Sequence, residues 1–124
     1  MNILKPKIPD QLTAVDDLQS YSEDYRRDEA AVKSISVTNN CIQYGNMYKL
    51  DVRGAVFKNC VFIDCDFEKA SFQDVIFHGC DFSNSNLRES YFNKCSFSSC
   101  KCLGTDFSEV ILKQIEIQNS NYQY

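Results

Sequence analysis

The sequence predicts an all-β solenoid, in which the chain winds into a square coil and buries large side chains inside. Three observations support this prediction. A large, mostly apolar residue recurs at every fifth position from Val37 to Tyr122, except that Cys102 takes one of these positions. All nine Phe of the chain fall in this one register. The residue two places before each large one is usually small, as at Ala55, Cys60 and Ala70.

A period of five suits neither regular secondary structure. Five residues advance a helix by roughly 500°, so the large side chains would drift by about 140° per repeat. On a straight strand, five steps place successive large residues on opposite faces. The large residues share an interior only if the chain turns a corner once per pentad, so that four pentads make one coil and the next coil stacks beneath it.

The register predicts the composition of the core. Adding twenty to a residue number gives its neighbour in the next coil, so Phe57, Phe77 and Phe97 are expected to form one stack. Small residues form parallel columns, and we expect cysteines such as Cys60 and Cys80 to act there as compact apolar fillers rather than redox or metal groups. The predicted core positions are Phe57, Phe62, Phe67, Phe72, Phe77, Phe82, Leu87, Phe92, Phe97, Phe107 and Leu112.

Several pentads follow one pattern closely: a small residue, a polar residue, Leu or Phe, and two polar residues. Residues 80–84, 85–89 and 105–109 are examples. Over residues 37–124 the sequence resembles the pentapeptide-repeat family. The resemblance implies a right-handed quadrilateral parallel β-helix with twenty residues per coil, or about four coils here, preceded by an N-terminal cap or tail at residues 1–36.

The two ends of the sequence differ in how they relate to the repeat. Val15, Leu18, Tyr21 and Tyr25 recur at spacings of three and four, which favours a short amphipathic helix over the first coil. A partly disordered tail is the alternative. At the other end the repeat runs through Ile115, Ile117 and Tyr122 to the last residue. Three interpretations stay open there: a homodimer through the C-terminal coil, as in several members of the family, a removed tail, or fraying of the last pentads.

Composition excludes several function classes. The net charge of −4 and the pI near 4.9 disfavour direct nucleic-acid binding. No apolar stretch approaches the eighteen residues or so that span a membrane. Seven Cys without a secretory signal favour a reduced, cytoplasmic location. We find no catalytic, metal or cofactor motif, and His78 follows a core Phe where side chains point to water, so we expect no enzyme activity.

The hypothesis that we prefer is a structural or protein-interaction module with an unknown protein partner. Apolar residues at positions that are usually polar supply a candidate contact patch: Val56, Val61, Ile63, Ile76, Leu103 and Ile111.

The family resemblance implies an alternative, because some members confer quinolone resistance by imitating DNA and binding gyrase or topoisomerase IV, both type II topoisomerases. Asp64, Asp66, Glu68 and Asp106 would then form an acidic partner-binding edge. Residues 37–124 hold ten acids and eight bases, and no loop interrupts the pentads, which favours the first hypothesis.

Overall fold

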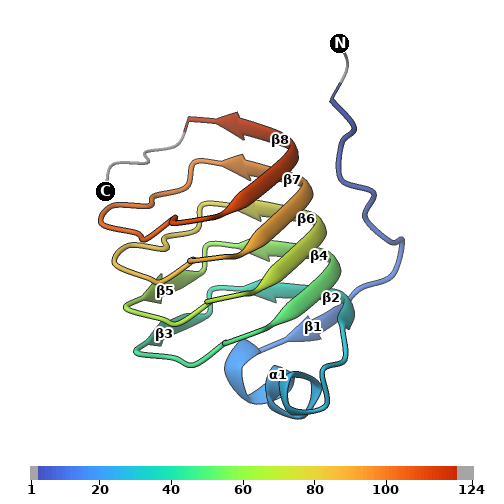
Figure 1. Cartoon of the computed structure of the whole chain (residues 1–124). Helices are drawn as coiled ribbons and strands as arrows, with labels where there is room; N and C mark the ends of the chain where they lie inside the picture. The colour runs from blue at the N-terminus through green and yellow to red at the C-terminus, as the bar shows by residue number, and fades with distance from the viewer. Residues whose placement is uncertain (1–2, 120–124) are drawn as a thin grey trace.

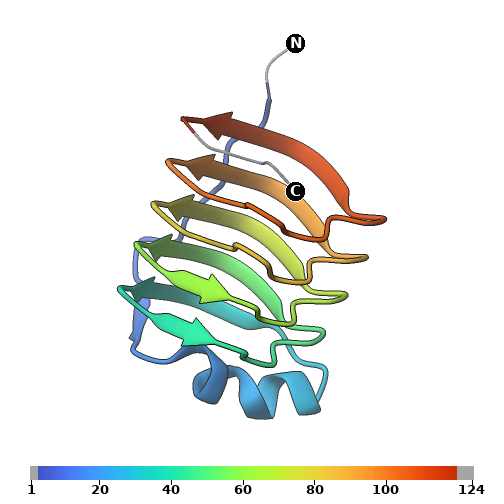
Figure 2. The same cartoon turned by 90° about the vertical axis from the view of Figure 1, so that its left-hand side faces the viewer.

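The computed structural model describes residues 3–119, which form a single stacked coil of parallel strands (Figure 1). One side of the coil is a parallel sheet in which each strand lies beside the strand of the next coil. A second side carries a shorter parallel pair (Figure 2). The sheet contains β1 (Thr13–Val15), β2 (Val32–Thr38), β4 (Asp51–Lys58), β6 (Ser71–His78), β7 (Tyr91–Ser98) and β8 (Ile111–Gln118), and the pair contains β3 (Cys41–Gln43) and β5 (Val61–Ile63).

The register between successive coils is twenty residues. Phe57 pairs with Phe77, and Phe77 pairs with Phe97. Isolated parallel bridges keep the same spacing on the remaining sides, as between Asp66 and Asn86. The fold is therefore the quadrilateral parallel β-helix that the repeat predicts. Its first coil strand, β2, begins at the buried Val32 and so crosses the expected division between residues 36 and 37.

The corners of the coil have one backbone conformation. Sixteen non-glycine residues and three glycines between Glu29 and Asn119 have φ between 51° and 74°, and all of them fall in one five-residue register. This left-handed conformation bends the chain sharply and costs an L-residue about 1–2 kcal/mol. The corner residues include Lys69 and Glu89, so the stacked coil holds this backbone conformation without relying on glycine.

Phenylalanine rings form the core, as predicted. Ring centroids of Phe57 and Phe77 lie 5.2 Å apart, and those of Phe77 and Phe97 lie 4.8 Å apart, both in stacked geometry. Phe72 stacks on Phe92 at 5.0 Å. Burial of each ring is worth roughly 1.5–3 kcal/mol relative to an exposed ring, so these stacks are the main stabilising feature of the fold.

One predicted core position is wrong. Leu112 lies in the core register one coil after Phe92, yet 51% of its surface is exposed. Phe107, in the same last coil, is only partly buried. Both residues lack a further coil to cover them within the described chain, whereas Phe92 and Leu87 are buried between two coils.

The N-terminal segment closes the opposite end. Helix α1 (Leu18–Arg27) lies across the first coil (Figure 2). Asp17 caps it by accepting a hydrogen bond from the Gln19 N–H, and Leu18 inserts fully into the core. The helix differs from the expected amphipathic pattern because Ser22 is buried with Leu18, while Tyr21 and Tyr25 stack on each other at the exposed side. At ten residues, α1 is too short to cross a membrane, and the described residues contain no longer helix.

An extended arm, residues 3–10, runs along the outside of the coils toward the C-terminal end (Figure 1). It follows a column of corner residues. The Lys7 N–H donates to Asp74 Oδ1, and the Leu4 N–H donates to Gln114 Oε1, both at 3.0 Å. Pro9 lies against Gly54, where a Cβ atom would approach the proline ring to 3.0 Å. The arm therefore links the first coils to the last one.

Candidate protein-interaction surfaces

The acidic edge proposed from the sequence is partly a structural feature of the turns. Asp66 Oδ1 accepts a hydrogen bond from the Glu68 N–H, and Asp106 Oδ1 accepts from the Ser108 N–H, both at 2.9 Å. Asp81 and Asn86 accept in the same way from the N–H groups of Ser83 and Arg88, each two residues later. These are Asx turns, in which the side chain replaces a backbone acceptor. The acids at these positions therefore hold the corner as well as supplying charge.

The edge is not continuously negative. Asp64, Asp66 and Glu68 lie together in one coil, but Asn86 separates Asp66 from Asp106 in their shared column. Arg88 occupies the position of Glu68 one coil further on, and its Nη2 lies 3.8 Å from Glu109. The pKa of Asp106 is lowered chiefly by the hydrogen bonds from Ser108, so this carboxylate is charged at neutral pH. The arrangement is a mixed-charge surface with a small acidic group in one coil.

The apolar residues of the candidate patch divide into two sets. Val56 and Ile76 pair in adjacent coils, and both are partly buried, as are Val61 and Ile63. Leu103 and Ile111 are exposed, at 39% and 52% of their surface. The patch is therefore spread over several sides of the coil, and its exposed members lie near the C-terminal end.

The small inward residues do more than fill space. The Cys60, Cys80 and Cys100 thiols donate to the carbonyls of Val37, Phe57 and Phe77, each 23 residues earlier, at 3.3–3.5 Å. The hydroxyls of Ser85 and Thr105 do the same to Phe62 and Phe82, at 2.7 and 2.8 Å. Residues at this position therefore satisfy buried carbonyls in the previous coil, which explains why Cys, Ser and Thr alternate with Ala and Val there.

None of the seven cysteines forms a disulfide. Burial raises the pKa of the Cys95 and Cys102 thiols to about 12, so these groups are protonated at neutral pH. Cys41 is the exposed thiol. His78 lies on the outer surface, where Nδ1 is 2.9 Å from Ser98 Oγ in the next coil. Among residues 3–119, no three His, Cys, Asp or Glu side chains are grouped to hold a metal ion.

Within residues 3–119, the C-terminal end of the coil is open and apolar. A cavity of about 300 Å³ lies at the C-terminal side of the last Phe layer and is lined almost entirely by side chains of the core register. Ile117 is 48% exposed, although it pairs with the buried Phe97. Tyr122, which continues this register in the sequence, lies outside the described residues. The lining residues are Phe82, Leu87, Phe92, Phe97, Cys102, Phe107, Val110, Leu112, Ile115 and Ile117.

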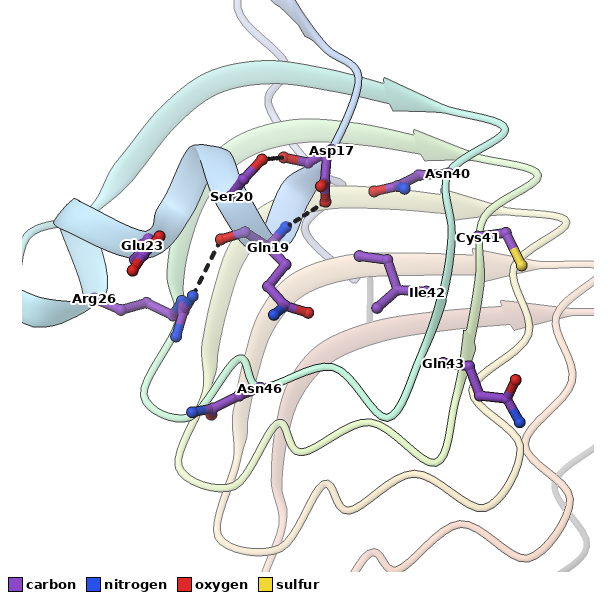
Figure 3. Close-up of a pocket in the computed structure, with 10 residues that line it drawn as sticks. All are labelled: Asp17, Gln19, Ser20, Glu23, Arg26, Asn40, Cys41, Ile42, Gln43 and Asn46. Atoms are coloured by element: carbon purple, nitrogen blue, oxygen red, sulfur yellow. Dashed lines mark hydrogen bonds between the residues drawn. The ribbon is translucent and has the colours of Figure 1, made fainter.

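The N-terminal end carries a different, polar hollow of about 660 Å³ between α1 and the first coil (Figure 3). Asp17, Gln19 and Glu23 line it from the helix side, and Asn40 and Gln43 line it from the coil. Our sequence interpretation missed this hollow. The available signal was Asn40, a polar residue at the head of the column that continues as Cys60, Cys80 and Cys100.

These features together define a β-solenoid with a helical cap at one end and an apolar opening at the other. A family model described as a pentapeptide repeat region matches residues 50–124. The chain belongs to this pentapeptide-repeat family. No curated protein matches the sequence.

Solved structures of QnrB1, a plasmid-mediated fluoroquinolone resistance protein, have a similar fold. The full-length structure superposes with a TM-score of 0.70 over 92% of this chain at 21% identity, and a trypsin-treated variant gives 0.68 over 89% at 23% identity. The chain spans 58% and 53% of the length of those two QnrB1 chains. The pentapeptide repeat protein Rfr23 from the cyanobacterium Cyanothece 51142 matches at 16% identity over 75% of this chain and 64% of its own, with a TM-score of 0.35.

Proposed function

We propose that this chain is a non-catalytic protein-interaction module that associates with a second copy of itself through its C-terminal coil. The open end of the coil carries this proposal. Leu112 and Ile117 occupy core positions but are half exposed around the apolar cavity. Water contact with such side chains is unfavourable by roughly 25 cal/mol per Å² of apolar surface, which favours a cover.

A second copy suits this end because the two surfaces would be alike. A two-fold axis perpendicular to the coil axis would place the apolar opening of one protomer on that of the other. β8 is the last strand of the sheet within residues 3–119, so strand pairing or close packing at this edge would add to the contact. The oppositely placed N-terminal end is polar and capped by α1, so it would remain available for other partners.

Light scattering coupled to size-exclusion chromatography tests this proposal. We expect the wild-type chain to elute at twice its mass of 14.3 kDa, and the variants Leu112→Asp and Ile117→Asp to elute as monomers. Leu103→Asp is the matched control, because Leu103 is exposed but does not line the cavity. A monomeric wild-type chain at concentrations of tens of micromolar would overturn the homodimer.

The fold similarity to QnrB1 favours a second candidate function, in which the chain binds DNA gyrase or topoisomerase IV as a DNA mimic and protects it from quinolones. A TM-score of 0.70 over 92% of the chain supports it. In this case Asp64, Asp66 and Glu68 would contact the enzyme. The interruption of the acidic edge by Asn86 and Arg88 makes it the weaker candidate.

A gyrase supercoiling assay with and without ciprofloxacin tests this second function. Protection at micromolar chain, lost in an Asp64→Asn, Glu68→Gln double variant, would support it. These two substitutions leave the Asx-turn acid Asp66 in place, so the fold is expected to be unaffected. Equal enzyme activity with and without the chain at all drug concentrations would exclude it.

A further inference from the structure

The free edge of β3 lies on the N-terminal side of the first coil, beside the polar hollow. Among the described residues β3 pairs with β5 alone, so its other edge has no strand partner in that part of the chain. The adjoining side of the same coil is different, because β1 pairs there with β2 in parallel, with Val15 opposite Val37. The chain therefore adds an extra strand to one side of its first coil and leaves the next side open.

The backbone groups at this open edge can be identified from the next coil. The Val61 N–H donates to the Asn40 carbonyl, and the Asp66 N–H donates to the Gly45 carbonyl. The carbonyl of Ile63 accepts from the Tyr44 N–H. The equivalent groups one coil earlier belong to Cys41, Asn46 and Gln43, and no coil precedes them on this side within residues 3–119. Since N–H groups alternate in direction along a strand, the Gln43 N–H also points to the open edge.

A buried side chain at this place also lacks a partner. Asn40 is 8% exposed, and its Oδ1 accepts the Leu18 N–H at 2.9 Å. Its Nδ2 makes no hydrogen bond within residues 3–119, and the side chain extends from the coil into the space beside α1 (Figure 3). This donor is therefore available to an acceptor that enters the hollow.

The charges around the hollow indicate the character of that partner. Asp17 and Glu23 are carboxylates on its helix side. The single cation among the lining residues, Arg26, already donates to Ser22 Oγ and to the Gln19 carbonyl, at 3.0 and 3.1 Å. The hollow therefore carries negative charge that is only partly offset. Ile42 is partly buried and lies below the open edge, so a small aliphatic side chain would pack on it.

We propose that an extended, basic peptide segment of a partner protein binds the free edge of β3 as an added parallel strand. Its backbone pairs with the free groups of Cys41, Gln43 and Asn46, and one of its carbonyls accepts the Asn40 Nδ2–H. Strand addition of this kind takes its affinity from main-chain hydrogen bonds and its specificity from alternate side chains. The proposal rests on the interaction function proposed above and names the second partner that the N-terminal end would receive.

The probe is the blocked pentapeptide acetyl-Lys-Thr-Val-Thr-Lys-amide, titrated into the full, isotope-labelled chain and followed by NMR. We expect the largest amide shifts at Cys41, Gln43 and Asn46. A version of the peptide with alternate backbone nitrogens methylated, and a version with Glu in place of Lys, should each bind at least about fivefold more weakly, because each lost hydrogen bond or charge contact is worth about 1 kcal/mol.

The chain offers a matched pair of variants. Gln43→Pro removes one N–H of the open edge and none that pairs with β5, so the fold should persist, and peptide affinity should fall by about fivefold. Gln43→Thr changes the side chain but keeps that N–H, and should bind as the wild type does. Shifts confined to β8, equal binding of the methylated peptide, or no shift at millimolar peptide would overturn the proposal.

These outcomes are separable from those of the proposed function. The homodimer uses Leu112 and Ile117 at the other end of the coil, so light scattering of the Gln43→Pro variant should be unchanged. A dimer that forms without any peptide binding would refute strand addition and leave the interaction module in place. Loss of the dimer with peptide binding intact would refute the homodimer and leave strand addition in place.

Discussion

The hydroxyl of Ser85 donates to the carbonyl of Phe62 at 2.7 Å and accepts the Cys65 N–H at 3.0 Å. Ser85 is buried, so one small side chain satisfies two backbone groups of the previous coil in the interior. The same position holds Thr105 one coil later, where Oγ1 donates to Phe82. The contact shows that a small residue with a hydroxyl also joins neighbouring coils, which Ala and Val at the same position do not do through a side-chain hydrogen bond.

This relationship predicts an asymmetric effect of substitution at residue 85. Ser85→Ala leaves two buried backbone groups without partners and should lower the free energy of unfolding by about 2–4 kcal/mol. Ser85→Thr keeps the hydroxyl, as Thr105 does, and should change stability by less than about 1 kcal/mol. Urea unfolding followed by circular dichroism measures both values. Equal stability of the two variants would contradict the proposed role of the hydroxyl.

The position of a core residue along the coil should decide how much it contributes to the free energy of unfolding. Phe72 and Leu112 share one column, but Phe72 is buried between coils and Leu112 is half exposed. Phe72→Ala should lower stability by about 3–5 kcal/mol, and Leu112→Ala by about 1 kcal/mol or less. The measurement is chemical unfolding of dilute protein, because association through the last coil would enlarge the effect of Leu112→Ala. Similar losses in both variants would show that Leu112 is covered.

The left-handed corners predict that glycine can stabilise this fold. Lys69 is exposed and has a φ of 60°. Lys49, at the same corner one coil earlier, has a φ of 61°. Lys69→Gly should therefore raise the melting temperature, corresponding to a gain of about 0.5–1 kcal/mol. Lys101 is also exposed but lies outside the corner register, so Lys101→Gly is the control and should lower stability. A loss in both variants would mean that strain at the corner is already relieved.

The Asx turn at Asp106 predicts a dependence on pH. Hydrogen bonds from Ser108 lower the pKa of this carboxyl below its ordinary value of 3.8. Because the folded pKa is the lower one, the stabilising contribution is full above about pH 4 and is lost as the pH falls through the folded value. Asp106→Asn keeps the acceptor but does not titrate, so its unfolding midpoint should depend less on pH between 2 and 4. Parallel curves for both proteins would contradict this assignment.

Thiol accessibility should follow burial. Cys95 and Cys102 have pKa values raised to about 12, and thiolate is the reactive form, so they should resist modification at pH 8. Cys41 is exposed and should react first with a disulfide reagent such as DTNB. The other six thiols are buried, so the native chain should show one fast thiol, which Cys41→Ser removes, and all seven thiols should react in urea. Fast reaction of a second thiol in native Cys41→Ser would indicate local opening of the coil.

Much of the fold could be predicted from local pattern. The five-residue register identified the stacked rings of Phe57, Phe77 and Phe97 because the position of a side chain inside or outside the coil repeats with the chain itself. The interaction surfaces were harder to predict. The acidic edge was inferred from adjacent numbers in the register, but the Asx turn of Asp66 and the intervening Asn86 depend on backbone geometry that composition does not report.

The sequence by itself determined the coil, its twenty-residue register and the identity of the core column, because these follow from side-chain size repeated at a fixed spacing. Only the tertiary structure decided which of those positions are covered. Burial of a residue depends on the coil above and the coil below it, so Leu112 is exposed at one end although its pentad is ordinary. For the same reason the edge of β3 is open at the other end of the described chain, where β1 covers only the neighbouring side.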